Sequence, residues 1–309
     1  MGKLINGEWI VRSIITSDKD GHYDRLPRTF LETISKNHHI YQPESDRYHL
    51  YVSLACPWAT RTLIYRHLKE LHKHISVSIV HPDMLENGWK FDEKFPEATV
   101  DHLYNEKFLK DIYIKADPNI TTSVTVPILW DKKTHTIVNN ESSQIIRIFN
   151  KEFNDLTNNT DDYYPSEKQR EIDKMNDLIY ENINNGVYKC GFAITQTAYD
   201  KAVTKLFNAL DEIEIILGKK KFLLGNTITE ADIRLVPTLL RFDCVYVTHF
   251  KCNMKRIIDY KNLYRYVGDL MKIPAIKETF HLEHIKRHYY YSHDQINPNR
   301  IIPKGPVDL

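Results

Sequence analysis

The spacing of apolar and polar positions divides the chain into a first part with strands and helices and a second part with helices only. Alternating positions rich in β-branched and aromatic side chains predict strands over 48–54, 75–80, 124–130 and 136–138. Apolar residues recur at helical spacing over 60–72 and 141–153. This order predicts a small mixed sheet covered by helices.

The rest of the chain follows a different pattern. A long polar insertion after the second strand includes one predicted helix, 105–115. Beyond residue 165 the spacing is helical throughout, and Thr229 with Asp232 predicts a capping box at one helix start. The interpretation is an α/β domain followed by an all-α domain. Its predicted segments are an extension over 1–45, the sheet domain over 46–153, a linker over 154–165, and a helical domain with an extended tail over 166–309.

The composition of the chain argues against several classes of protein. Lys and Arg number 42 and Asp and Glu number 41, so the net charge is +1. Such a balance argues against a nucleic-acid binder that neutralises phosphates. No apolar run reaches the ~20 residues that a membrane span needs. Four cysteines in 309 residues are too few for a disulfide scaffold, and the N-terminus lacks the apolar core of a secretory signal. The cytoplasm is the expected location.

The first candidate for chemistry is Cys56, which lies in the sequence Cys56-Pro57-Trp58-Ala59 between a predicted strand and a predicted helix. A helix N-terminus lowers the pKa of a cysteine through its unpaired amides and its dipole. Ala59 stands where a dithiol enzyme has its second cysteine, so an outside thiol has to release any disulfide formed on Cys56. The alternative, at about even odds, is a structural cysteine at a tight turn.

Two further features point to ligand contacts. A cis Val126-Pro127 bond exposes the backbone of Val126 to an extended ligand, whereas a trans proline at a strand start is the ordinary alternative. Glu141 and Ser142 open a predicted helix after a strand. There, Ser142 suits a carboxylate and Glu141 suits an ammonium group, although an ordinary helix cap needs the same residue types.

A competing arrangement is a zinc site. His281, His284 and His288 are spaced three and four residues apart, which places imidazoles on one helix face. The spacing matches no diagnostic zinc motif, and Lys286 and Arg287 interrupt it. No metal is therefore expected.

Together, Cys-Pro-Trp-Ala, Val-Pro and Glu-Ser resemble the glutathione site of the thioredoxin-like domain in the glutathione transferase superfamily. More specifically, the chain resembles the xi class, the glutathionyl-hydroquinone reductases. The matching stretches are 50–59, 86–89, 124–127, 139–143, 185–189, 241–253, 288–293 and 296–298. The resemblance implies a thioredoxin-like domain followed by an all-helical domain. It also implies glutathione-dependent removal of glutathione from glutathionylated hydroquinones, and a homodimer.

The resemblance also implies roles for individual residues. Cys56 matches the nucleophile, and Tyr188 and Tyr289 match tyrosines that face the quinol and assist protonation of the leaving group. Phe192 is expected to pack against the flat substrate, and Tyr290 matches a neighbour of the substrate-facing tyrosines. The residues that match glutathione contacts are Trp89, Val126, Pro127, Glu141 and Ser142. In a chain with 19 tyrosines, packing in the helical core is the competing role for any one of them.

One departure and two alternatives stay open. Members commonly carry Gly-Arg where this chain has Thr122-Ser123, so a guanidinium contact to glutathione is absent or supplied from elsewhere. An omega-like thioltransferase or dehydroascorbate reductase would share Cys56 and the glutathione site. A non-catalytic interaction module with the same fold is the third reading, and the joint presence of Cys56, Trp89, Glu141 and Ser142 argues against it.

Overall fold

The computed structural model describes residues 2–11, 16–24 and 28–306. The chain divides into two compact units. The first comprises 1–14, 26–162 and 281–288, and the second comprises 15–25, 163–280 and 289–309. Each unit is described separately below.

A four-stranded mixed sheet forms the centre of the first unit, with strand order β6-β5-β7-β8. Strand β5 pairs in parallel with β6 and antiparallel with β7, and β7 pairs antiparallel with β8. The bounds are β5 Tyr48–Val52, β6 Ile75–Ile79, β7 Ile128–Asp131 and β8 Thr136–Asn139. All five residues of β5 are buried, as expected for a central strand. The predicted mixed sheet is confirmed.

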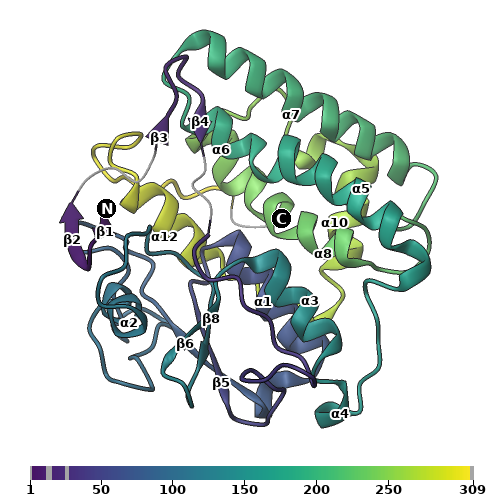
Figure 1. Cartoon of the computed structure of the whole chain (residues 1–309). Coiled ribbons are helices and arrows are strands. Elements are labelled where there is room, and N and C mark those ends of the chain that lie inside the picture. The colour runs from purple at the N-terminus through teal and green to yellow at the C-terminus, as the bar shows by residue number, and fades with distance from the viewer. Residues whose placement is uncertain (1, 12–15, 25–27, 307–309) are drawn as a thin grey trace. The chain divides into compact units, whose positions relative to one another are not determined.

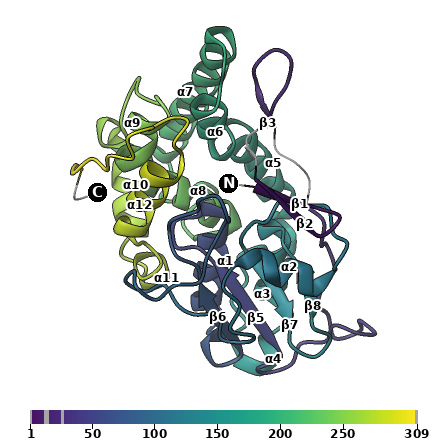
Figure 2. The ribbon, with the colours of Figure 1, turned by 90° about the vertical axis from the view of Figure 1, so that its left-hand side faces the viewer.

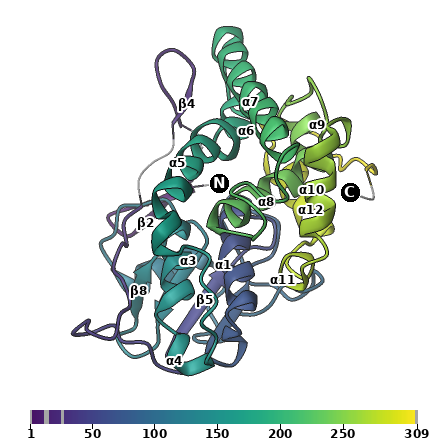
Figure 3. The same ribbon diagram turned by 90° about the vertical axis from the view of Figure 1, so that its right-hand side faces the viewer.

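Helices flank this sheet. Helix α1 (Pro57–Leu68) packs against α3 (Ser142–Lys151), and Figures 1 and 3 show the two side by side next to the strands. Helix α2 (Leu109–Ala116) contacts β8. The remaining elements between β5 and the second unit are the 3-10 turn η1 (Leu71–Lys73) and the short helix α4 (Asn154–Thr157), which lies in the predicted linker.

The segment 1–45, which the sequence predicted as an extension, contains four short strands among its described residues. Strands β1 (Gly2–Ile5) and β2 (Glu8–Val11) form an antiparallel hairpin beside α2 (Figures 1 and 2). Leu4 is fully buried, and its backbone exchanges two hydrogen bonds with Thr122. The hairpin is therefore part of the first unit. A second short pair, β3 (Thr16–Ser17) with β4 (Tyr23–Asp24), belongs to the second unit.

The second unit is helical apart from β3 and β4, among the residues that the structure describes. Figures 2 and 3 show α5, α6 and α7 side by side. Its helices are α5 Gln169–Ile179, α6 Gly186–Gly191, α7 Gln196–Leu217, α8 Glu230–Arg241, α9 Val247–His249, α10 Lys261–Leu270 and α11 Pro274–Lys277. Shorter helical turns are η2 Ser166–Lys168, η3 Tyr180–Asn184, η4 Phe242–Tyr246 and η5 Ile257–Asp259. Helix α12 (Leu282–Ser292) contributes residues to both units.

The predicted capping box at the start of α8 is present. The Thr229 amide and hydroxyl donate to one carboxylate oxygen of Asp232 at 2.8 and 3.0 Å. The other oxygen accepts from the Leu223 amide at 3.0 Å and the Tyr266 hydroxyl at 2.7 Å. Asp232 is fully buried, so this side chain joins a loop and two helices inside the second unit.

We expect Asp232→Ala to lower the free energy of unfolding by ~3 kcal/mol, because it leaves several buried donors without an acceptor. Urea unfolding followed by circular dichroism measures the change. Asp177→Ala removes an exposed carboxylate on α5 and is the matched control. Equal losses in the two variants would show that the buried network contributes nothing specific.

No helix in the described ranges is both long enough and apolar enough to cross a membrane.

Candidate active site

Cys56 lies at the start of α1, directly after the turn that follows β5. It occupies the cap position with extended backbone angles, and Pro57 takes the first helical position, where its missing amide hydrogen costs nothing. Its amide donates to the Ser53 carbonyl at 3.1 Å, which closes the turn. Cys56 is partly exposed, whereas the other three cysteines, Cys190, Cys244 and Cys252, are buried. A thiol at the first amides of a helix is placed for nucleophilic chemistry.

Val126 lies next to this sulfur. The Cys56 Sγ donates to the Val126 carbonyl oxygen at 3.7 Å, and the Val126-Pro127 peptide bond is cis. The strand predicted over 124–130 begins only at Ile128, because Pro127 has no amide hydrogen to give to a ladder. The Tyr113 hydroxyl donates to the Thr125 carbonyl at 2.9 Å. This hydrogen bond fixes the backbone directly before Val126 and the cis peptide bond. The structure therefore brings two of the predicted residues, Cys56 and Val126, into contact.

Glu141 and Ser142 open α3, as predicted. Glu141 is the cap residue, and its Oε1 accepts from the Ser143 amide and hydroxyl, each at 2.9 Å, and from the Ser142 hydroxyl at 3.4 Å. Burial acts to raise the pKa of Glu141, but the two hydrogen bonds from Ser143 lower it. The guanidinium groups of Arg28 and Arg61 lower this pKa further, and the net direction is below the ordinary value. Glu141 is thus a carboxylate that caps its own helix.

Arg61 supplies positive charge near this carboxylate from within the first unit. It is buried on α1, and its guanidinium carbon lies 4.5 Å from the ring centroid of Trp58. Ser123 stands where members of the class commonly carry arginine, and Thr122 before it pairs through its backbone with Leu4 of the N-terminal hairpin. Sequence reasoning did not identify Arg61, because its spacing of five residues from Cys56 is not one that places two side chains on the same face of a helix.

Trp89 lies in a different loop. It is 5% exposed and stacks on His288, with ring centroids 4.7 Å apart. The loop turns at Gly88, whose φ of +74° is one that glycine adopts freely. The Trp9 indole of the N-terminal hairpin donates to the Glu86 carbonyl at 2.9 Å. The hairpin therefore braces the loop that carries Trp89, and no described hydrogen bond or ring contact joins Trp89 to Cys56.

In the second unit, three tyrosine hydroxyls form a chain. Those of Tyr188 and Tyr289 are 2.6 Å apart, and those of Tyr289 and Tyr246 are 3.0 Å apart. Tyr289 is 1% exposed and Tyr246 is fully buried, whereas Tyr188 is partly exposed. Burial raises the pKa of both Tyr289 and Tyr246 well above the ordinary value, so both stay protonated at neutral pH.

Sequence reasoning missed Tyr246. Nothing in its local spacing separates it from a core tyrosine, and it joins the other two only through the packing of η4, α6 and α12. The stretch 241–253, which contains Tyr246, was part of the family resemblance, so the sequence indicated the segment but not the residue.

Aromatic rings surround the chain of tyrosine hydroxyls. Phe192 contacts Tyr23 and Phe250 with ring centroids 5.3 and 5.0 Å apart. Tyr290 is buried. Its hydroxyl donates to the Cys244 carbonyl at 3.2 Å, and its ring contacts His249. The structure thus groups Tyr188, Tyr289 and Phe192, whereas the described partners of Tyr290 are Cys244 and His249.

The histidines considered for zinc have other partners. His284 and His288 bond to the Pro96 and Pro82 carbonyls at 2.6 and 2.9 Å, and His281 pairs with Glu97. Among the described residues, no group of three or more His, Cys, Asp or Glu is arranged to hold a metal ion.

The fold and the Cys56 turn define a class: a thioredoxin-like thiol domain joined to a helical domain, as in glutathione transferases. Residues 55–152 match the family described as glutathione S-transferase, N-terminal domain, and residues 196–269 match its C-terminal counterpart. The chain belongs to the glutathione transferase family, in its xi class of glutathionyl-hydroquinone reductases. The predicted fold class and family are confirmed.

Three relatives illustrate the match. Glutathionyl-hydroquinone reductase YqjG of Escherichia coli K12 is 52% identical, over 99% of this chain and 95% of that protein. Its glutathione-bound structure superimposes with a TM-score of 0.90 at 51% identity, over 99% and 96% of the two chains. The glutathione S-transferase Xi of Phanerochaete chrysosporium gives a TM-score of 0.92 at 50% identity, over 94% and 95%. Glutathione S-transferase omega-like 2 of Schizosaccharomyces pombe is 50% identical over 94% of this chain and 95% of that protein.

Proposed function

We propose that the protein is a glutathione-dependent reductase that removes glutathione from glutathionyl-hydroquinones. The observation that carries the proposal is Cys56, the one partly exposed thiol among the four cysteines, at the first turn of a helix and with Ala59 in place of a second thiol. Identity to YqjG over nearly the full chain supports the choice of substrate class. Glutathione is the co-substrate, and no metal takes part.

In the proposed reaction, the Cys56 thiolate attacks the glutathione sulfur of the thioether. The sulfur–aryl bond breaks, its electron pair stays on the aryl carbon, and a proton gives the hydroquinone. A second glutathione then attacks the Cys56–glutathione disulfide, which yields oxidised glutathione and the free thiol. Because no neighbouring cysteine follows at position 59, the enzyme depends on this second glutathione.

The remaining residue roles are part of the proposal. Tyr188 donates the proton to the leaving aryl group, with Tyr289 acting through it. Phe192 and Tyr290 contribute apolar surface around the substrate. Trp89 and the Val126-Pro127 backbone contact glutathione, and the end of the tripeptide with an ammonium and a carboxylate lies at Glu141 and Ser142. We also propose that the protein acts as a homodimer in the cytoplasm.

The direct test is incubation with glutathionyl-menadiol and glutathione, with the free quinol and oxidised glutathione quantified by chromatography. Equal molar yields of the two products support the proposal. Failure to release quinol, while small mixed disulfides are still reduced, would favour the omega-like thioltransferase. That second candidate has support of its own, because the Schizosaccharomyces pombe relative carries the omega-like name.

Glu141→Gln is expected to raise the KM for glutathione roughly tenfold, because it removes the charge opposite the ammonium group but keeps an oxygen for the Ser143 hydrogen bonds. Since the pKa of Glu141 is lowered, the carboxylate stays ionised from neutral pH down to the pH range in which an ordinary glutamate becomes protonated. The KM of the wild type should therefore show no loss of this contact between about pH 7 and 5. Steady-state kinetics over this range test both points, with exposed Glu93→Gln as the control. An unchanged KM in Glu141→Gln would contradict the assignment.

A further inference from the structure

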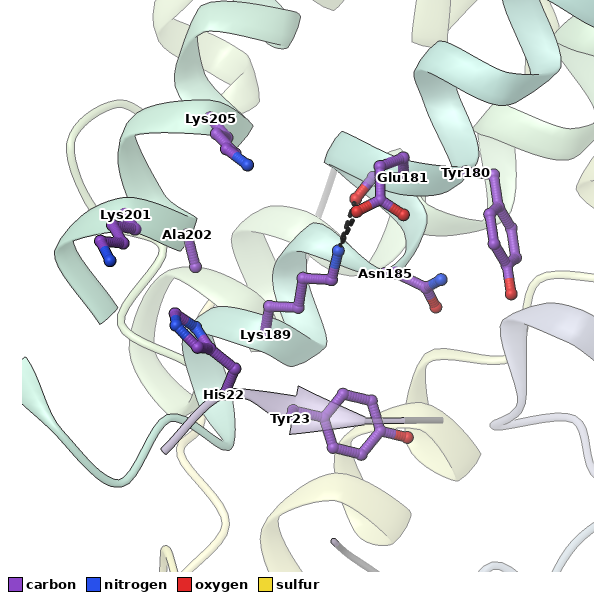
Figure 4. Close-up of a pocket in the computed structure, with 9 residues that line it drawn as sticks. All are labelled: His22, Tyr23, Tyr180, Glu181, Asn185, Lys189, Lys201, Ala202 and Lys205. Carbon is purple, nitrogen blue, oxygen red and sulfur yellow. Dashed lines mark hydrogen bonds and ion pairs between the residues drawn. The ribbon is translucent and has the colours of Figure 1, made fainter. Parts of the chain in front are cut away.

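The second unit contains a pocket beside the tyrosine chain, shown in Figure 4. Its volume is about 570 Å³, within the range of small-molecule sites. The wall is formed by strand β4 and the turn before it, segment η3, helix α6 and helix α7. The lining residues are His22, Tyr23, Tyr180, Glu181, Asn185, Lys189, Lys201, Ala202 and Lys205. All of them belong to the second unit.

Positive charge dominates this lining. Three lysines face a single carboxylate, Glu181, which forms an ion pair with Lys189. Lys201 and Lys205 are exposed on α7, and neither forms an ion pair with another described residue. The pocket therefore offers two ammonium groups whose charge nothing in the described part of the chain neutralises. Such a site favours an anionic ligand.

A buried amide in the wall also lacks a partner. Asn185 is 6% exposed, and its Oδ1 accepts no hydrogen bond from any described residue. Figure 4 shows its side chain on the pocket side of the helical turn, in the region of Tyr180 and Tyr23. Buried polar atoms are almost always hydrogen-bonded in native proteins. An amide carries both donors and an acceptor, so a polar ligand group in the pocket completes it.

Aromatic rings link the pocket to the proposed reaction centre. Tyr23 lines the pocket, and its ring centroid is 6.5 Å from that of Tyr188 and 5.3 Å from that of Phe192. Lys189 follows Tyr188 directly in the sequence, on the same turn of α6. A ligand that lies against Tyr188 is thus close to Tyr23, which lines the pocket.

We propose that this pocket holds a carboxylate substituent of the aryl substrate, so that the enzyme prefers hydroquinones that carry an acidic group. The inference rests on the proposed function and adds a substrate class to it. Lys201 and Lys205 supply the charge, Asn185 supplies a hydrogen bond, and the Tyr23 ring, which lies near Tyr188 and Phe192, packs against the aryl ring.

The test compares two substrates that differ by one methyl group and the negative charge that it removes: the glutathionyl conjugate of 2,5-dihydroxybenzoate and that of its methyl ester. In the wild type, we expect a lower KM for the acid. In the double variant Lys201→Gln and Lys205→Gln, the KM for the acid should rise roughly fivefold to tenfold, with a loss below about twofold for the ester. Lys219→Gln, an exposed lysine outside the pocket, is the control.

A binding measurement separates the two proposals. Isothermal titration with free 2,5-dihydroxybenzoate should show binding to the wild type that weakens in the double variant and at high salt. If the wild type turns over both conjugates and the double variant treats acid and ester alike, the pocket assignment is wrong and the proposed function stands. If neither conjugate is turned over but the acid still binds at the lysines, the site is real and the proposed function fails.

Discussion

Replacing Cys56 with serine is expected to reduce the release of hydroquinone from glutathionyl-menadiol by roughly three orders of magnitude or more. The hydroxyl is nearly isosteric with the thiol and keeps the place at the start of α1, but it is a far weaker nucleophile toward sulfur at neutral pH. Rapid-quench chromatography of the quinol measures the loss. Mass spectrometry of the wild type without added glutathione should show one glutathione attached to Cys56, and none on the variant.

The matched control is Cys244→Ser. Cys244 is buried in the second unit, where its Sγ donates to the Leu240 carbonyl at 3.5 Å, a bond that a serine hydroxyl can replace. We expect this variant to retain its rate. A Cys56→Ser enzyme that still turned over the conjugate would remove the thiol from the mechanism and leave the non-catalytic reading as the better one.

Local patterns predicted most of the first unit because each element there has its own periodic signal. Strands β5 and β6 and helices α1 and α3 appear where alternation or helical spacing placed them. The helix predicted over 60–72 begins earlier, at Pro57, because proline suits the first helical position and Cys56 provides the cap. The helix predicted over 105–115 begins later, at Leu109, because Asn105 has a left-handed φ of +56° and Phe108 is the extended cap residue.

The N-terminal hairpin shows a signal that was present and not used. Asn6 and Gly7 have φ of +49° and +78°, the conformation that an Asn-Gly pair adopts in a two-residue hairpin turn. The flanking strands are only four residues each, too short for alternation to stand out. The pairing of Leu4 with Thr122, by contrast, joins residues more than a hundred positions apart, and no local pattern encodes it.

The same limit applies to the candidate site. Cys56 and Glu141 were found because each lies at a helix start, which leaves a local mark in the sequence. The chain of tyrosine hydroxyls brings together positions 188, 246 and 289, which come from separate elements and look like ordinary core residues alone. Only tertiary packing shows that Tyr289 is buried between the other two hydroxyls.

The burial of Tyr289 gives the two predicted tyrosines, Tyr188 and Tyr289, different roles. Tyr289 contacts Tyr188 and Tyr246 through its hydroxyl, so we assign it a positioning role and keep proton donation for Tyr188. If Tyr246 donates to Tyr289 and Tyr289 donates to Tyr188, Tyr188 is oriented to donate to the substrate. The high pKa of the two buried phenols keeps both protons in place at neutral pH.

Tyr188→Phe is expected to lower kcat for release of the hydroquinone by roughly 10²-fold or more, the usual range for loss of a general acid. Tyr289→Phe should have a smaller effect on kcat, and Tyr246→Phe the smallest, because each lies one hydroxyl further from the substrate. None of the three should slow the reduction of a small glutathione mixed disulfide, whose thiolate leaving group needs no proton from a phenol.

The measurement is therefore a ratio of two activities in each variant: quinol release from glutathionyl-menadiol, and reduction of the mixed disulfide of glutathione with 2-mercaptoethanol. Tyr264→Phe, an exposed tyrosine on α10, is the control and should leave the ratio unchanged. A graded fall in the ratio, smallest for Tyr246 and largest for Tyr188, follows if Tyr188 donates the proton and the other two hydroxyls orient it through hydrogen bonds. Equal losses of both activities would mean that the tyrosines only support the fold, and an unchanged ratio in Tyr188→Phe would favour the omega-like thioltransferase.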